Sequence, residues 1–116
     1  MIKKEISELT LDPNERTALE KLKSGLEKKF PGSEIVLYGS RARGEGDKFS
    51  DLDILIIIDS SVNRDMRETI TAITYPLELE YDVVFGKIIE NRSDWDSQRS
   101  RSTPLHLNID REGVRI

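Results

Sequence analysis

The chain has 116 residues, no cysteine and a formal net charge of −4 at pH 7. The lack of cysteine excludes disulfides and thiolate metal sites. The acidic balance argues against a long nucleic acid as partner, because such binding relies on Lys and Arg. The sequence has no apolar run of membrane-spanning length and no signal-peptide core, so we expect a soluble cytoplasmic protein with a single domain over residues 1–116.

The first third of the chain is predicted to contain two helices and a strand. Apolar residues at helical spacing indicate a short helix over 2–9 and a longer one over 12–30. Asp12 and Glu15 form a capping-box pattern at the start of the longer helix. Residues 34–38 are rich in β-branched and aromatic side chains and are predicted to form a strand.

The remaining elements indicate an α/β fold. Residues 51–58 read as a strand whose apolar run shows no alternation, so we expect it to be covered on both faces. A helix is predicted over 66–75, followed by a third strand over 78–85. Residues 88–89 either extend the sheet or start a helix, and a last helix is predicted over 103–113.

The most informative pattern is Gly39-Ser40, followed after ten residues by Asp51-Leu-Asp53. Residues two apart on a strand project to the same face, so Asp51 and Asp53 are expected to aim their carboxylates together. Two like charges beside an apolar run are unfavourable unless a cation compensates them, and Mg²⁺ prefers carboxylates combined with phosphate oxygens. Gly39 permits a close approach of the backbone, and the amide and hydroxyl of Ser40 suit a phosphate. The pattern therefore predicts metal-dependent chemistry on a nucleoside triphosphate.

Two further sets of residues extend this predicted site. Asp82 opens the apolar part of the predicted third strand and would complete a cluster of three carboxylates, with Glu80 as a rival on the same face. Such a cluster can hold two metals and serve in-line displacement at phosphorus. Arg41 and Arg43 follow the Gly-Ser turn and add positive charge near the phosphates, although exposed arginines near a loop are often only solubilising.

At these residues the chain resembles the minimal nucleotidyltransferases of the DNA polymerase beta-like superfamily. The resemblance rests on Gly39, Ser40, Asp51, Asp53 and Asp82, and on the extended sequences Gly-Ser-Arg-Ala-Arg-Gly and Ser-Asp-Leu-Asp-Ile. It implies a nucleotidyltransferase fold, a small mixed β-sheet flanked by helices. It also implies transfer of a nucleoside monophosphate, here AMP from ATP, to a hydroxyl with Mg²⁺.

The resemblance further implies roles and partners. Asp51 and Asp53 would bind metal, Asp82 would bind the metal beside the attacking hydroxyl, and Gly39 and Ser40 would hold the β- and γ-phosphates. Minimal members often act as antitoxins of HEPN-domain toxins, and some transfer AMP to a tyrosine of the toxin. A partner protein is therefore expected to supply the hydroxyl, because the chain leaves little room for an acceptor-binding domain.

Two alternatives to this function stay open at this point. The chain could neutralise its partner by contact, with the site used only for nucleotide binding. It could instead transfer the nucleotide to a small molecule or RNA. Oligomeric state, whether homo- or hetero-oligomeric, is not determined by the sequence.

Overall fold

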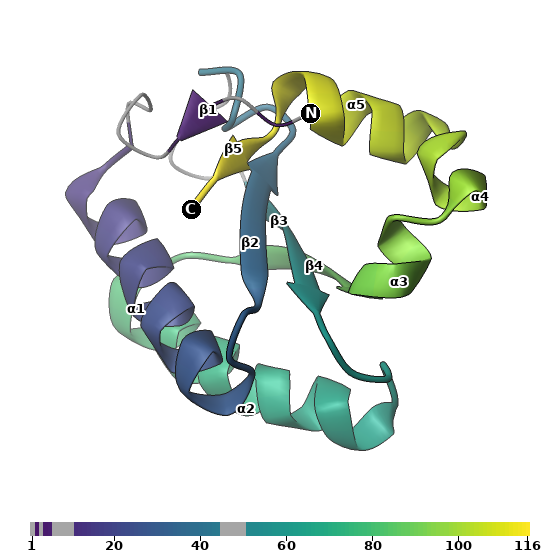
Figure 1. Cartoon of the computed structure of the whole chain (residues 1–116). Coiled ribbons are helices and arrows are strands. Elements are labelled where there is room, and N and C mark those ends of the chain that lie inside the picture. The colour runs from purple at the N-terminus through teal and green to yellow at the C-terminus, as the bar shows by residue number, and fades with distance from the viewer. Residues whose placement is uncertain (1, 3, 6–10, 45–50) are drawn as a thin grey trace.

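The computed structural model describes residues 2, 4–5, 11–44 and 51–116. Within these residues the strands form one five-stranded sheet in the order β1-β5-β2-β3-β4 (Figure 1). Strand β3 pairs antiparallel with β2 and parallel with β4, so the sheet is mixed. The predicted fold class, a small mixed sheet flanked by helices, is confirmed. The strands are β1 Lys4–Glu5, β2 Glu34–Tyr38, β3 Leu52–Ile58, β4 Phe85–Asn91 and β5 Val114–Arg115.

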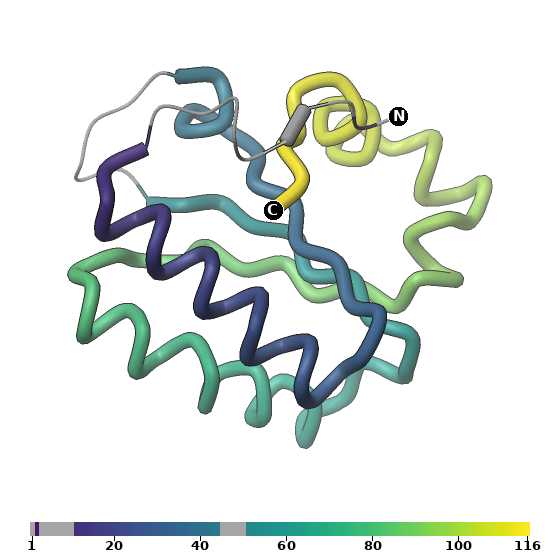
Figure 2. The backbone as a smooth tube through the Cα atoms, turned by 60° about the vertical axis from the view of Figure 1, so that its left-hand side comes forward, coloured from purple at the N-terminus to yellow at the C-terminus, as the bar shows by residue number. Residues whose placement is uncertain are grey.

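The helices lie on both sides of this sheet. Helices α1 and α2 run side by side along one face (Figure 2), and α3, α4 and α5 lie on the other side (Figure 1). Their bounds are α1 Pro13–Lys29, α2 Arg64–Tyr81, α3 Arg92–Trp95, α4 Gln98–Arg101 and α5 Pro104–Glu112. The predicted helix over 12–30 and the last predicted helix are therefore both present.

Strand β3 is buried on both faces, as its unbroken apolar run predicts. Ile54 and Ile56 belong to the core cluster that includes the leucines of α1. Leu55 and Ile57 pack instead in a second cluster with Trp95 of α3 and Ile109 of α5. The helices on either side thus fix which residues of β3 face which layer.

Helix α2 is longer than the sequence indicates, and the predicted strand over 78–85 is wrong. The helix continues through Pro76 to Tyr81, and the strand β4 begins only at Phe85. Leu77 and Tyr81 continue the apolar face of the helix and pack against the core. Burial of these two side chains outweighs the backbone hydrogen bond that a proline removes inside a helix.

Two smaller predictions are also decided. Lys4 and Glu5 form strand β1, which pairs in parallel with β5, so this part of the predicted first helix is wrong. Residues 3 and 6–9 of that prediction lie outside the described residues. Ile88 and Ile89 extend the sheet as part of β4, which settles the alternative that the sequence leaves open.

Candidate active site

The two carboxylates of the sequence motif lie at the N-terminal end of β3. Asp51 directly precedes the strand and is exposed, whereas Asp53 is its second residue and is partly buried. Asp53 shares a face of the sheet with Leu55 and Ile57, because alternate residues of a strand point the same way. Asp53 therefore lies on the face of the sheet that α3 and α5 cover farther along.

Asp53 carries an unfavourable charge in this position. Burial raises the pKa of the Asp53 carboxyl, and the negative charge of Asp51 raises it further. The pKa of Tyr38, the residue paired with Asp53 on β2, is also raised, first by burial and then by the charge of Asp53. A cation between Asp51 and Asp53 would relieve this repulsion, so the two residues fit a divalent metal.

Two glycines on the neighbouring strands make room for the Asp53 carboxylate. A Cβ built on Gly39, at the end of β2, would lie 2.6 Å from Oδ2 of Asp53. A Cβ built on Gly86, the register partner of Asp53 on β4, would lie 2.7 Å from Oδ1. Both distances are shorter than real side chains allow. The carboxylate therefore lies between two positions that glycine alone can occupy without a shift.

Residues 39–44 form the predicted turn beside this carboxylate. The amides of Ala42 and Arg43 both donate to the carbonyl of Gly39, at 3.1 and 3.2 Å. Gly39 adopts a positive φ of 79°, which side-chain-bearing residues rarely adopt, and Ala42 is buried against the main core. The turn thus begins at a glycine beside the Asp53 carboxylate, as a phosphate-binding segment near a metal site would require.

Both arginines of the turn form ion pairs within the protein. Arg41 donates from Nη2 to Oε1 of Glu15 on α1, and both side chains are largely buried. Arg43 donates from Nη1 to both carboxylate oxygens of Glu112 on α5, at 3.1 and 3.0 Å. These contacts tie the turn to two helices. A role for either arginine toward a nucleotide stays a prediction.

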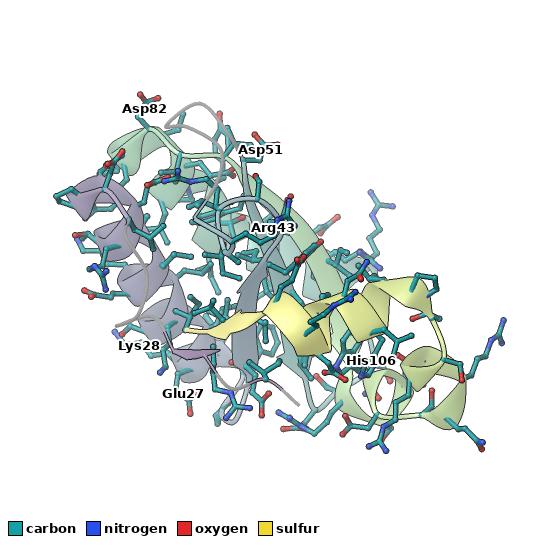
Figure 3. The ribbon with its side chains drawn as sticks, turned by 90° about the horizontal axis from the view of Figure 1, so that it is seen from above. Glu27, Lys28, Arg43, Asp51, Asp82 and His106 are labelled. Carbon is teal, nitrogen blue, oxygen red and sulfur yellow. The ribbon has the colours of Figure 1, made fainter. Side chains whose placement is uncertain are left out.

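Asp82 lies in a different setting from the one that the sequence predicts. It is the C-cap of α2, with a left-handed φ of 53° and an exposed side chain, and not a strand residue beside Asp53. Its rival Glu80 lies inside α2. Asp82 and Asp51 do lie at the same end of the molecule (Figure 3). Among the described residues no three acidic or histidine side chains are grouped so that they could hold a metal together.

Comparison with known proteins identifies the family. The profile of the nucleotidyltransferase domain matches residues 19–105, a range that contains the Gly-Ser turn and both aspartates. The chain belongs to this nucleotidyltransferase family. A relative from Methanocaldococcus jannaschii is 31% identical over 102 residues, 86% of this chain and 95% of the relative. A second relative from the same organism is 32% identical over 59 residues, 51% of this chain and 60% of that relative. Both carry the name "putative protein adenylyltransferase".

Membership in the nucleotidyltransferase family makes a nucleoside triphosphate the expected substrate of this site. Two residues of the site are not singled out by sequence reasoning. Gly86 reads as the end of a predicted strand, and Glu15 reads only as part of a capping box. Their contacts with Asp53 and Arg41 arise from strand register and helix packing, for which the sequence carries no local signal.

Within the described residues no helix is long and apolar enough to cross a bilayer.

Proposed function

We propose that this nucleotidyltransferase transfers AMP from ATP, with Mg²⁺, to a hydroxyl group of a partner protein. The observation that carries the proposal is the Asp51–Asp53 pair against the turn that begins at Gly39. The names of the two relatives support a protein as acceptor and an adenylyl group as the transferred unit. Resemblance to minimal nucleotidyltransferases supports a HEPN-domain toxin as the partner.

Each residue of the site has a definite task under this proposal. Asp51 and Asp53 would hold Mg²⁺, which neutralises and orients the triphosphate when bound. Gly39 and Ser40 would hold the β- and γ-phosphates through backbone amides and the Ser40 hydroxyl. The two glycines leave the room in which the Asp53 carboxylate would be positioned, and phosphoryl transfer depends on such positioning.

The acceptor hydroxyl would attack the α-phosphorus of ATP in line with the leaving group. A bond forms between the acceptor oxygen and the α-phosphorus, the bond to the bridging oxygen breaks, and pyrophosphate leaves. The proton of the hydroxyl passes to a nearby base. Asp82, the C-cap of α2, stays the predicted third carboxylate that helps to remove this proton.

The experiment measures both halves of the proposed reaction. Calorimetric titration of the chain with ATP, with and without Mg²⁺, should detect binding that depends on Mg²⁺. Incubation with Mg²⁺, ATP and a co-expressed HEPN-domain protein, followed by intact mass spectrometry, should detect one added AMP on that protein. Both signals should disappear in the double variant Asp51→Asn with Asp53→Asn. The matched control Asp65→Asn changes an exposed aspartate in the first turn of α2 and should leave them unchanged.

A contact-only antitoxin would give a different outcome. The double variant would still neutralise the HEPN-domain protein in growing cells, and no AMP would appear on that protein with the wild-type chain. That result would refute the transfer reaction. Neutralisation lost together with the AMP adduct would support it.

A further inference from the structure

Glu15 does more in this fold than complete a helix cap. It lies in the first turn of α1 and is only 3% exposed. Its Oε1 accepts from the backbone amide of Asp12 at 3.0 Å and also from the guanidinium of Arg41. A capping box by itself needs only the first of these contacts and is satisfied at an exposed helix end. The burial of Glu15 is explained by its second partner.

Arg41 has donors that Glu15 does not use. Its side chain is 11% exposed, and its Nε is buried with no hydrogen-bond acceptor in the part of the chain that the structure describes. Buried N–H groups without an acceptor are rare in folded proteins, and each one calls for an explanation such as a bound ligand. An anion bound at the 39–44 turn would bring acceptor oxygens to the segment that carries this guanidinium.

The turn itself depends on anchors outside it. Its backbone hydrogen bonds are all long, from 3.1 to 3.3 Å between donor and acceptor. The Arg41–Glu15 pair and the buried Ala42 fix one side of the turn. The Arg43–Glu112 pair fixes the other side and is more exposed, at 42% and 23%. The Arg41–Glu15 pair is therefore the more buried of these two ion pairs that hold the turn against a helix.

We infer that Glu15 is a positioning residue for the triphosphate, which acts by holding Arg41 and thereby the Gly39–Ser40 backbone in the orientation that binds phosphate. The inference rests on the proposed nucleotide-binding function of the same site. A charge-assisted hydrogen bond is stronger and shorter than a neutral one, so a carboxylate orients the guanidinium better than an amide would.

The test is a calorimetric titration with Mg²⁺ and ATP across a small set of variants. Glu15→Ala should weaken ATP affinity roughly tenfold. Glu15→Gln keeps an acceptor for the Asp12 amide and should weaken affinity by about threefold. The matched control Glu68→Gln alters the exposed Arg64–Glu68 ion pair of α2, which does not involve the turn, and should keep the wild-type affinity. In an Arg41→Ala background, Glu15→Ala should cause no further loss, because the two residues act through one contact.

A merely structural role would give another pattern. Misfolding of part of the sample lowers the binding stoichiometry and the Tm but leaves the affinity of the folded fraction unchanged. Wild-type affinity in folded Glu15→Ala or Glu15→Gln, or additive losses with Arg41→Ala, would overturn the inference while the proposed function stands. Wild-type chain that binds Mg²⁺ and ATP but transfers nothing would overturn the proposed function alone. Failure of the wild type to bind ATP would overturn both.

Discussion

Replacement of Gly86 by alanine perturbs the site without removing any of its chemical groups. Gly86 lies beside Asp53 in the β3–β4 register. The new Cβ would meet Oδ1 of Asp53 at 2.7 Å, while Oδ2 lies 2.6 Å from the place that a Cβ on Gly39 would take. A carboxylate that turns away from the new Cβ moves toward Gly39 on the other neighbouring strand. Gly86→Ala should therefore displace Asp53 itself.

The size of the effect follows from these distances. Oδ1 must move by roughly 0.7 Å, from 2.7 Å to the 3.4 Å of an ordinary contact. Overpacking of this kind costs about 1–3 kcal/mol, which the better strand propensity of alanine offsets by roughly 0.5–1 kcal/mol. We expect a net loss of about 1 kcal/mol in the free energy of unfolding. Displacement of groups that orient metal ligands typically costs 10–100-fold in affinity, so Mg²⁺-dependent ATP affinity should fall about tenfold or more.

Thermal melting and calorimetric titration measure the two effects separately. Gly25→Ala is the matched control. The new Cβ would meet the Ile73 side chain of α2 at 3.0 Å and neither of the two aspartates. Gly25→Ala should alter the Tm and leave ATP affinity intact. Gly39→Ala should be worse than Gly86→Ala in both assays, since its positive φ adds about 1–2 kcal/mol of backbone strain. Wild-type ATP affinity in Gly86→Ala, with Asp53→Asn inactive, would refute this reasoning.

Three further predictions concern single side chains. Asp53→Asn should raise the Tm of the metal-free protein at neutral pH. Because the pKa of Asp53 is raised in the folded protein, ionisation of this carboxyl lowers the stability of the protein as the pH rises through that folded-state pKa. An amide does not ionise and therefore removes this loss. Added Mg²⁺ should then no longer raise the Tm in melts of Asp53→Asn. Asp82→Asn should keep the wild-type Tm, because asparagine tolerates the left-handed C-cap conformation. If Asp82 is the third carboxylate, the same variant should transfer AMP more slowly than the wild type, as measured by mass spectrometry. His106→Ala should cost about 2–3 kcal/mol in urea unfolding and change Trp95 fluorescence, because the two buried rings stack at 4.0 Å.

Each of these has an outcome that contradicts it. A lower Tm for metal-free Asp53→Asn would mean that the charged carboxylate is well solvated or paired. Transfer at the wild-type rate by Asp82→Asn would assign Asp82 to the helix cap alone and leave activation of the hydroxyl to the partner. His106→Ala should keep Mg²⁺-dependent ATP binding, since His106 lies apart from Asp51 (Figure 3). A selective loss of that binding without unfolding would contradict a purely structural role.

The sequence by itself determined the parts of the fold that depend on neighbouring residues. The capping pattern of α1 and the β-branched run of β2 are local signals, and their bounds in the structure agree closely with those predicted. The unbroken apolar run of β3 likewise required burial on both faces. The motif from Gly39 to Asp53 placed the turn and the carboxylates, because a strand fixes which side chains share a face.

Only the tertiary structure decided how β3 meets its neighbours. Pro76 is a local stop signal, but burial of Leu77 and Tyr81 against the core extends α2 and shifts β4 to Phe85. That shift moves Asp82 to a helix cap and brings Gly86 beside Asp53. Register and packing between distant segments are set by the shape of the whole core, which no local sequence pattern records. The sequence therefore predicts the Gly39–Asp53 motif, strand pairing places Gly86 beside Asp53, and the role of Asp82 as third carboxylate stays a prediction.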